Sequence, residues 1–205
     1  MFAIVESGSI TSYPKGNKGI QIGDTKYPAT IYTLWTEAER NAIGVYTVEI
    51  DYTNKKNEEW YINTNESYAF GSGKVTGSYG TATAKAHADT KWTQKEIDDG
   101  DAPTGADTDT VKDEGLKTIL IRTVKAQAEG ILNETDWYIT RKAEKSTAIP
   151  SAITTHRDAV RTKQARMCTA ITNASDTPAL ETLYTYTKQE DGSVTRPLGV
   201  LPTLS

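Results

Sequence analysis

Hydrophobic and polar residues alternate over the first 86 residues in a pattern typical of short β-strands. Gly, Pro and Asn-rich stretches separate the alternating runs, as expected for strands joined by turns. The predicted strands are Phe2–Val5, Ile10–Tyr13, Val45–Asp51, Trp60–Asn63, Ser67–Phe70 and Lys74–Tyr79. Gly8 and Gly73 lie between neighbouring runs and can adopt the positive φ of a tight turn. Residues 1–86 are therefore predicted to form a small antiparallel β-rich module.

A short helix is expected to interrupt these strands. Thr36 precedes Glu37 and Glu39, which is the pattern of an N-cap followed by acidic residues in the first turn. Gly44 follows Ile43 as a stop signal, so the helix is predicted over Thr36–Ile43.

The pattern changes at residues 87–115, which hold 3 basic and 9 acidic side chains and almost no large apolar ones. Such a segment buries too little surface to offset the cost of ordering its backbone. The aspartates also lack the spacing of a calcium-binding loop. Residues 87–115 are therefore predicted to be an acidic flexible linker.

Helical periodicity follows over residues 116–175. Apolar residues recur at three- and four-residue steps from Leu116 to Leu132, and again from Ile153 to Ile171 after Pro150, which suits the first turn of a helix. Two helices joined by a connection of this length usually pack antiparallel, so a helical hairpin is expected.

The last segment, residues 176–205, begins with the helix-start signal Asp176-Thr177-Pro178. Glu190-Asp191-Gly192 then lies between two short runs that are expected to pair as a β-hairpin, followed by a Pro-containing tail or arm. The whole chain is thus predicted to have an α+β fold.

Composition points to contact surfaces rather than to a large core. Hydrophobic residues make up 37% of the chain, and 11 Tyr and 4 Trp outnumber 2 Phe and 2 Met. Tyr and Trp suit half-buried and interfacial positions because each joins an apolar ring to one polar group.

The charge pattern argues against nucleic acid as a partner. The net charge is -4, although residues 116–175 carry 10 basic and 5 acidic side chains, a run more typical of a solvated helix face. The N-terminus lacks the features of a signal peptide, and no apolar run reaches the roughly 18 residues of a membrane span. We therefore expect a protein made in a cytoplasm, with no membrane partner.

Motifs for catalysis are scarce. The chain has 2 His and 1 Cys, no G-x-S-x-G elbow and no phosphate-binding glycine loop, and neither His has a second ligand at metal-binding spacing. The sequence predicts no enzyme activity, no metal site and no cofactor. Sugar binding stays an alternative, because Trp60, Tyr61, Tyr68 and Tyr79 could stack on a glycan, although cross-strand packing is the favoured role of these rings.

One ordered set of residues resembles a known family. The stretch Thr135-Asp136-Trp137-Tyr138, followed by Arg141, Glu144, Ile149-Pro150, Arg157 and Arg161, resembles the pattern of phage tail assembly chaperone proteins, which is seen also at the C-termini of virion proteins near tail-fibre genes. The similarity spans roughly residues 115–172. The N-terminal block is similar in style to phage virion structural proteins, through Ile22-Gly23-Asp24 and Thr33-Leu34-Trp35 among others.

These residues are expected to form a clasp at the closed end of the helical hairpin. Asp136 would cap the turn, Trp137 would fill the closed end, and Arg141, Glu144, Arg157 and Arg161 would pair across it. The alternative is a partner-binding site, since Trp and Arg dominate the energetics of protein interfaces.

The resemblance implies a structural component of a phage tail, baseplate or tail-fibre attachment apparatus. Its partners would be other tail, baseplate or fibre proteins, bound in several copies per particle, and its location would be the tail of the virion after synthesis in the host cytoplasm. Two alternatives stay open: a tail or tail-fibre assembly chaperone that is not retained in the virion, and a carbohydrate-binding receptor module.

Overall fold

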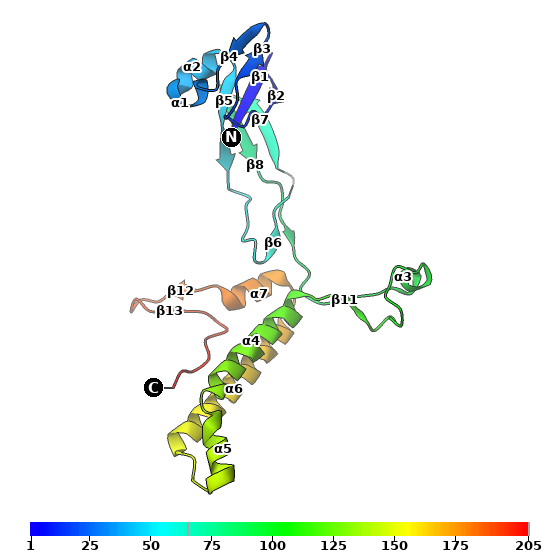
Figure 1. The fold of residues 1–205 in the computed structure, drawn as a ribbon, viewed down its shortest axis with the longest axis vertical. Coiled ribbons are helices and arrows are strands. Elements are labelled where there is room, and N and C mark those ends of the chain that lie inside the picture. Colours follow the sequence, from blue (N-terminus) through cyan, green and yellow to red (C-terminus); the bar gives the residue numbers. More distant parts are fainter. Residues whose placement is uncertain (65, 205) are drawn as a thin grey trace. The chain divides into compact units, whose positions relative to one another are not determined.

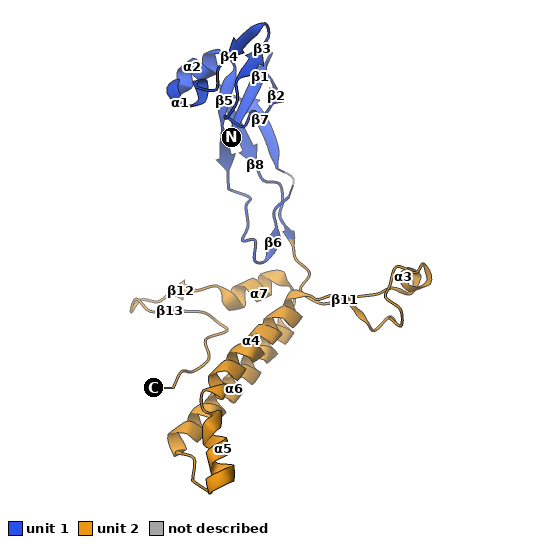
Figure 2. Ribbon diagram, in the orientation of Figure 1, with its two compact units in different colours: residues 1–83 blue, residues 84–205 orange. Residues whose placement is uncertain are grey.

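The computed structural model describes residues 1–64 and 66–204, and its helices and strands confirm the predicted α+β class. The chain divides into two compact units, which are drawn in blue and orange in Figure 2. We call Met1–Thr83 the sheet unit and Ala84–Ser205 the helical unit. The division falls close to residue 86, where the sequence pattern changes.

A five-stranded sheet in the order β2-β1-β5-β8-β7 forms the centre of the sheet unit (Figure 1). Its strands are β1 (Phe2–Glu6), β2 (Ser9–Ser12), β5 (Val45–Asp51), β7 (Ser67–Gly71) and β8 (Lys74–Ser78). Strands β1–β2 and β7–β8 are the predicted hairpins, and both turn glycines have the expected positive φ, 78° at Gly8 and 75° at Gly73. Strand β5, however, pairs with β8 in parallel. The sheet is therefore mixed, which corrects the expectation of a wholly antiparallel module.

Apolar side chains pack on both faces of this sheet. Ala3 and Ile4 are both buried and point to opposite faces because side chains alternate along a strand. Ile4 packs with Val45 and Ile31, while Ala3 packs with Val48 and Val75. Each face therefore has a core of its own.

Helices α1 (Ile31–Leu34) and α2 (Glu37–Ala42) lie beside the first of these cores. The predicted N-cap Thr36 forms a capping box with Glu39, in which each side chain bonds to the backbone N–H of the other residue. Over the second core the sheet curls: Tyr13, next to β2, contacts Tyr68 of β7 with ring centroids 5.2 Å apart.

Some short elements of this region were not predicted. Strands β3 (Ile20–Ile22) and β4 (Thr25–Tyr27) form a hairpin around Gly23, which has a φ of 56°. Strand β9 (Thr83–Ala84) was not predicted either, and it pairs with β6 (Tyr61–Ile62), which lies within the predicted run Trp60–Asn63. Strands of two or three residues carry too few alternating positions to produce a clear pattern in the sequence.

The predicted helical hairpin consists of α4 (Leu116–Asn133) and α6 (Ser151–Asn173). The helices are antiparallel, since Lys117 at the start of α4 donates to the carbonyl of Thr172 (2.9 Å), while Arg157 near the start of α6 donates to the carbonyl of Leu132 (2.7 Å). Val124, Ala128, Val160 and Met167 are buried between the two ends.

The connection between these helices is not only a turn. It contains a third helix, α5 (Asp136–Lys145), which ends at Ser146 in the left-handed conformation, φ 54°. The charged residues of this stretch predict only a connection between the two helices. Charge alone does not prevent a helix, and Lys142 and Lys145 suit the negative end of its macrodipole.

The segment predicted to be an acidic flexible linker also contains regular structure, which corrects that prediction. Strands β10 (Thr90–Lys91) and β11 (Val111–Asp113) pair antiparallel, and helix α3 (Gln94–Asp98) lies between them. We call residues 90–113 the acidic finger. It has little apolar surface, so local capping and ion pairs hold it rather than a core, and composition alone does not reveal such contacts.

The finger is joined to the start of α4 by Asp89. Its carboxylate accepts hydrogen bonds from the N–H of Gly115 (2.7 Å), 26 residues further along the chain, and from the hydroxyl of Thr118 (2.9 Å), so it fixes the start of α4. These bonds lower the pKa of Asp89, the bond from Gly115 most strongly.

The C-terminal elements follow the prediction. Helix α7 (Thr177–Tyr184) is capped by Asp176, and strands β12 (Thr187–Lys188) and β13 (Val194–Thr195) form the small hairpin. Beyond it the side chain of Leu198 is buried and its N–H donates to the carbonyl of Leu183. Within the part of the chain that the structure describes, no helix has the length and apolar character needed to cross a membrane.

Candidate protein-binding site at the closed end of the helical hairpin

A buried arginine closes the hairpin where α4 ends. Arg157 is 7% exposed, and its Nη1 donates to the carbonyl of Leu132 (2.7 Å) and to the hydroxyl of Thr135 (2.6 Å). The last carbonyls of a helix have no partner within the helix, so a cation placed there satisfies them and suits the helix dipole. Arg157 therefore ties α6 to the end of α4.

The same side chain also fixes the start of α5. Nη2 of Arg157 forms an ion pair with Asp136 (2.8 Å), the first residue of that helix. The hydroxyl of Thr135, which accepts from Arg157, donates in turn to the carbonyl of Leu132 (3.0 Å). We call Leu132, Thr135, Asp136 and Arg157 the clasp. It brings together Asp136 and Arg157, two of the six residues predicted to form the site, and it adds Thr135, which belongs to the matched stretch but was given no role there.

Trp137 does not fill the closed end, and this corrects the role expected for it. Its side chain is 51% exposed, whereas Thr135 and Arg157 are the residues buried there. The Trp137 ring stacks instead on the ring of Tyr138, with centroids 3.8 Å apart. The guanidinium of Arg141 lies over both rings, 4.7 Å and 5.2 Å from their centroids.

The other two selected residues do not pair across the turn either. Arg161 forms an exposed ion pair with Asp158 on its own helix (3.3 Å). It lies one helical turn beyond Arg157, which places it away from α5. Glu144 is exposed on α5, and no ion pair involving it is found within residues 1–64 and 66–204. The clasp thus uses one arginine of the three in the motif.

Helix α5 presents a mixed aromatic and cationic surface. Trp137, Tyr138 and Arg141 form a stacked group, and Ile139, three residues before Lys142 on the same helix, is 45% exposed. Lys142 and Lys145 extend the surface toward the end of the helix. We call these six residues the platform. Exposed Trp and Arg beside apolar area are typical of binding hot spots between proteins.

Other chemistry has little support in the arrangement of side chains. Among the described residues, no three His, Cys, Asp or Glu side chains are grouped so that they could hold a metal ion. The groove beside the clasp is lined mainly by polar side chains such as Lys125, Glu129 and Gln164. Such a groove lacks the enclosed apolar walls of a small-molecule site.

The aromatic residues considered for sugar binding have differing environments. Trp60 and Tyr61 are buried, with 2% and 5% of their surface exposed. The Tyr68 ring lies against Gly77, and its hydroxyl donates to Glu66 (2.8 Å). These rings are therefore not arranged as a common exposed stacking face.

Compared with known proteins, the chain matches no family model, no curated protein and no solved structure. The resemblance to phage tail assembly chaperone proteins therefore stays a prediction.

Proposed function

We propose that this chain is a non-enzymatic structural component of a phage tail, baseplate or tail-fibre attachment apparatus, and that it acts through protein–protein contacts. The platform on α5 is the observation that carries this proposal. It lies within residues 115–172, where the sequence resembles phage tail assembly chaperone proteins.

The platform is preorganised for binding. Its aromatic rings and the guanidinium of Arg141 are stacked on one another before any partner arrives. The clasp holds the first residue of α5 through the Asp136–Arg157 pair. The side chains of the platform would therefore lose little conformational entropy when a partner binds, which favours binding.

The two-unit architecture also supports a connecting role. The sheet unit has an apolar core on each face of its sheet, and the helical unit has its own packed seam. Each unit can therefore offer a separate surface to a different neighbour. Several copies in one particle would strengthen individually modest contacts through avidity.

The test is quantitative mass spectrometry of gradient-purified particles of the phage that encodes the chain. The protein is expected at a constant, small ratio to the major capsid protein. Its absence from intact particles, together with its presence in the infected-cell lysate, would overturn the structural role and favour the assembly chaperone.

A pair of variants links this role to the platform. Trp137→Ala is expected to fold normally but to be recovered from particles at a much lower ratio. Tyr186→Ala removes another half-exposed aromatic side chain of the helical unit and serves as the matched control. Equal incorporation of both variants would show that the platform is not the contact surface.

A further inference from the structure

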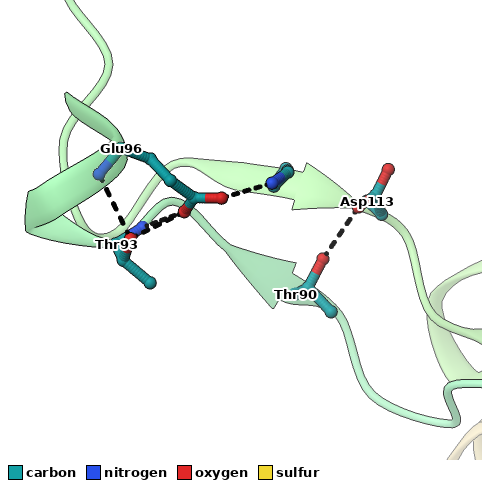
Figure 3. Close-up of polar contacts among 5 residues, drawn as sticks. Thr90, Thr93, Glu96 and Asp113 are labelled. Carbon is teal, nitrogen blue, oxygen red and sulfur yellow. Dashed lines mark hydrogen bonds and ion pairs between the residues drawn. The ribbon is translucent and has the colours of Figure 1, made fainter. Parts of the chain in front are cut away.

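The acidic finger is ordered by its own contacts (Figure 3). Glu96 accepts from the N–H and hydroxyl of Thr93 (2.9 Å and 2.7 Å) and pairs with Lys112 across the finger. Lys112 in turn lies over the ring of Trp92, 4.7 Å from its centroid. The pair with Lys112 and the bonds from Thr93 lower the pKa of Glu96 to about 2. The finger is thus a preformed projection.

The finger presents unpaired negative charge. It contains seven acidic residues and three lysines, and each lysine has one acidic partner: Lys91 with Asp109, Lys95 with Asp99, and Lys112 with Glu96. The other four carboxylates of the finger are exposed and form no ion pair with a Lys or Arg of the described chain. They are Asp98, Asp101, Asp107 and Asp113. Val111, also on the finger, is 43% exposed and adds apolar surface.

The platform presents the complementary charge. Arg141, Lys142 and Lys145 form no ion pair with any residue that the structure describes, whereas Arg122, Arg157 and Arg161 of the same hairpin are each paired with an acid. The unpaired cations of α5 lie beside the exposed side chains of Trp137 and Ile139. The platform therefore combines positive charge with exposed apolar area, whereas the finger combines negative charge with exposed apolar area.

Finger and platform lie at opposite ends of α4. Asp89 holds the base of the finger at Gly115 and Thr118, where α4 begins, and α5 follows the end of α4 (Figure 1). At about 1.5 Å per residue, the 18 residues of α4 separate these ends by about 27 Å. The finger projects away from the hairpin in Figure 1, so it does not reach the platform of its own chain.

We infer that the platform binds the acidic finger of a second copy of this chain, so that copies associate head to tail. This inference rests on the protein-binding role proposed for the platform and names its partner. The contact joins two different surfaces, so it is heterologous and produces a ring or an open row of copies. Arg141 and Lys142 face Asp98 and Asp101, while Trp137 covers the exposed side chain of Val111.

Charge-swapped variants of the full chain test this contact by sedimentation velocity over a range of protein concentrations. Arg141→Glu with Lys142→Glu is expected to weaken self-association about tenfold or more, because like charges then meet across the interface. Asp98→Lys with Asp101→Lys is expected to do the same. An equimolar mixture of the two double variants should regain association, because each supplies the charge that the other lacks.

A matched control separates this contact from an effect of net charge. Lys125→Glu with Arg166→Glu makes the same change in charge on α4 and α6, and it should leave association unchanged. Wild-type association should also weaken between ionic strengths of about 0.01 M and 1 M, where the Debye length falls from about 30 Å to 3 Å.

Three results would overturn the inference: a wild-type chain that stays monomeric at all concentrations, no recovery in the mixture, or an equal loss in the control. None of these would contradict the proposed function. If Trp137→Ala is still lost from particles, the platform binds a different protein there. If self-association follows the expected pattern but the chain is absent from particles, the inference stands and the tail role fails.

Discussion

The two units of this protein achieve order in different ways. The sheet unit packs apolar side chains on both faces of one sheet, with Ile31 and Val75 fully buried on opposite sides. The helical unit has only a narrow apolar seam between two helices, and its closed end is held by the polar clasp around Arg157. Apolar packing is not directional, whereas a hydrogen-bonded clasp works only in one geometry.

This difference shows why the helical unit is the better candidate for a binding surface. A two-helix hairpin leaves part of each helix exposed, and a directional clasp can hold α5 in place without burying Trp137 or Ile139. The sheet unit buries apolar side chains such as Ile31 and Val75 in its own two cores, although Leu34 stays exposed. Stability and binding surface are therefore concentrated in different parts of the chain.

The largest expected effect is in the sheet unit. Ile31→Ala should lower the free energy of unfolding by roughly 3 kcal/mol, because it leaves a cavity beside Ile4 and Val45. Leu34→Ala on the same short helix is the control: Leu34 is 77% exposed, so a change below about 0.5 kcal/mol is expected. Urea unfolding followed by circular dichroism measures both, and similar losses for the two variants would contradict this core.

The next effect is in the clasp. Arg157→Ala should cost about 2 kcal/mol, since it leaves Thr135 and the carbonyl of Leu132 without their cationic partner. The loss is smaller than for a fully buried ion pair because water can solvate the half-exposed carboxylate of Asp136. Arg161→Ala removes an exposed pair of the same helix and should cost less than about 0.5 kcal/mol. Equal losses in urea unfolding would show that Arg157 has no special role.

A smaller, pH-dependent effect is expected at the cap of α4. Because the pKa of Asp89 is lowered in the folded chain, its carboxylate stabilises the fold at pH values above its ordinary pKa of 3.8. This contribution disappears as the pH falls through the lowered pKa. Asp89→Asn should therefore be less stable than the wild type at neutral pH, and the difference should shrink in acid. Thermal unfolding between about pH 7 and pH 2 measures this, and a difference independent of pH would exclude a role of the charge.

The smallest effect on stability is expected on the platform. Trp137→Ala should change the free energy of unfolding by less than about 0.5 kcal/mol, because half of the side chain already contacts water. The same urea titration measures it. A loss above about 1 kcal/mol would mean that Trp137 contributes to the packing of the hairpin, as the sequence analysis first expected.

Local chemistry in the sequence was sufficient for much of the fold. The predicted N-cap Thr36 bonds to Glu39, three positions away, and the hairpin turns depend on single glycines such as Gly8 and Gly73. Alternation over Val45–Asp51 and helical periodicity over residues 116–133 likewise follow from neighbouring residues. These features can be predicted because the interacting groups are close in the sequence.

Only the tertiary structure decided which residues far apart in the sequence pair with one another. Strand β5 pairs in parallel with β8, and Asp89 holds the start of α4 through the N–H of Gly115, 26 residues later. From the sequence, Arg141, Arg157 and Arg161 were all expected to pair across the turn. Helix packing buried Arg157 alone, so it became the clasp, whereas Arg141 and Trp137 remained at the surface and formed the platform. Burial depends on the whole arrangement of helices, and no spacing along the chain specifies it.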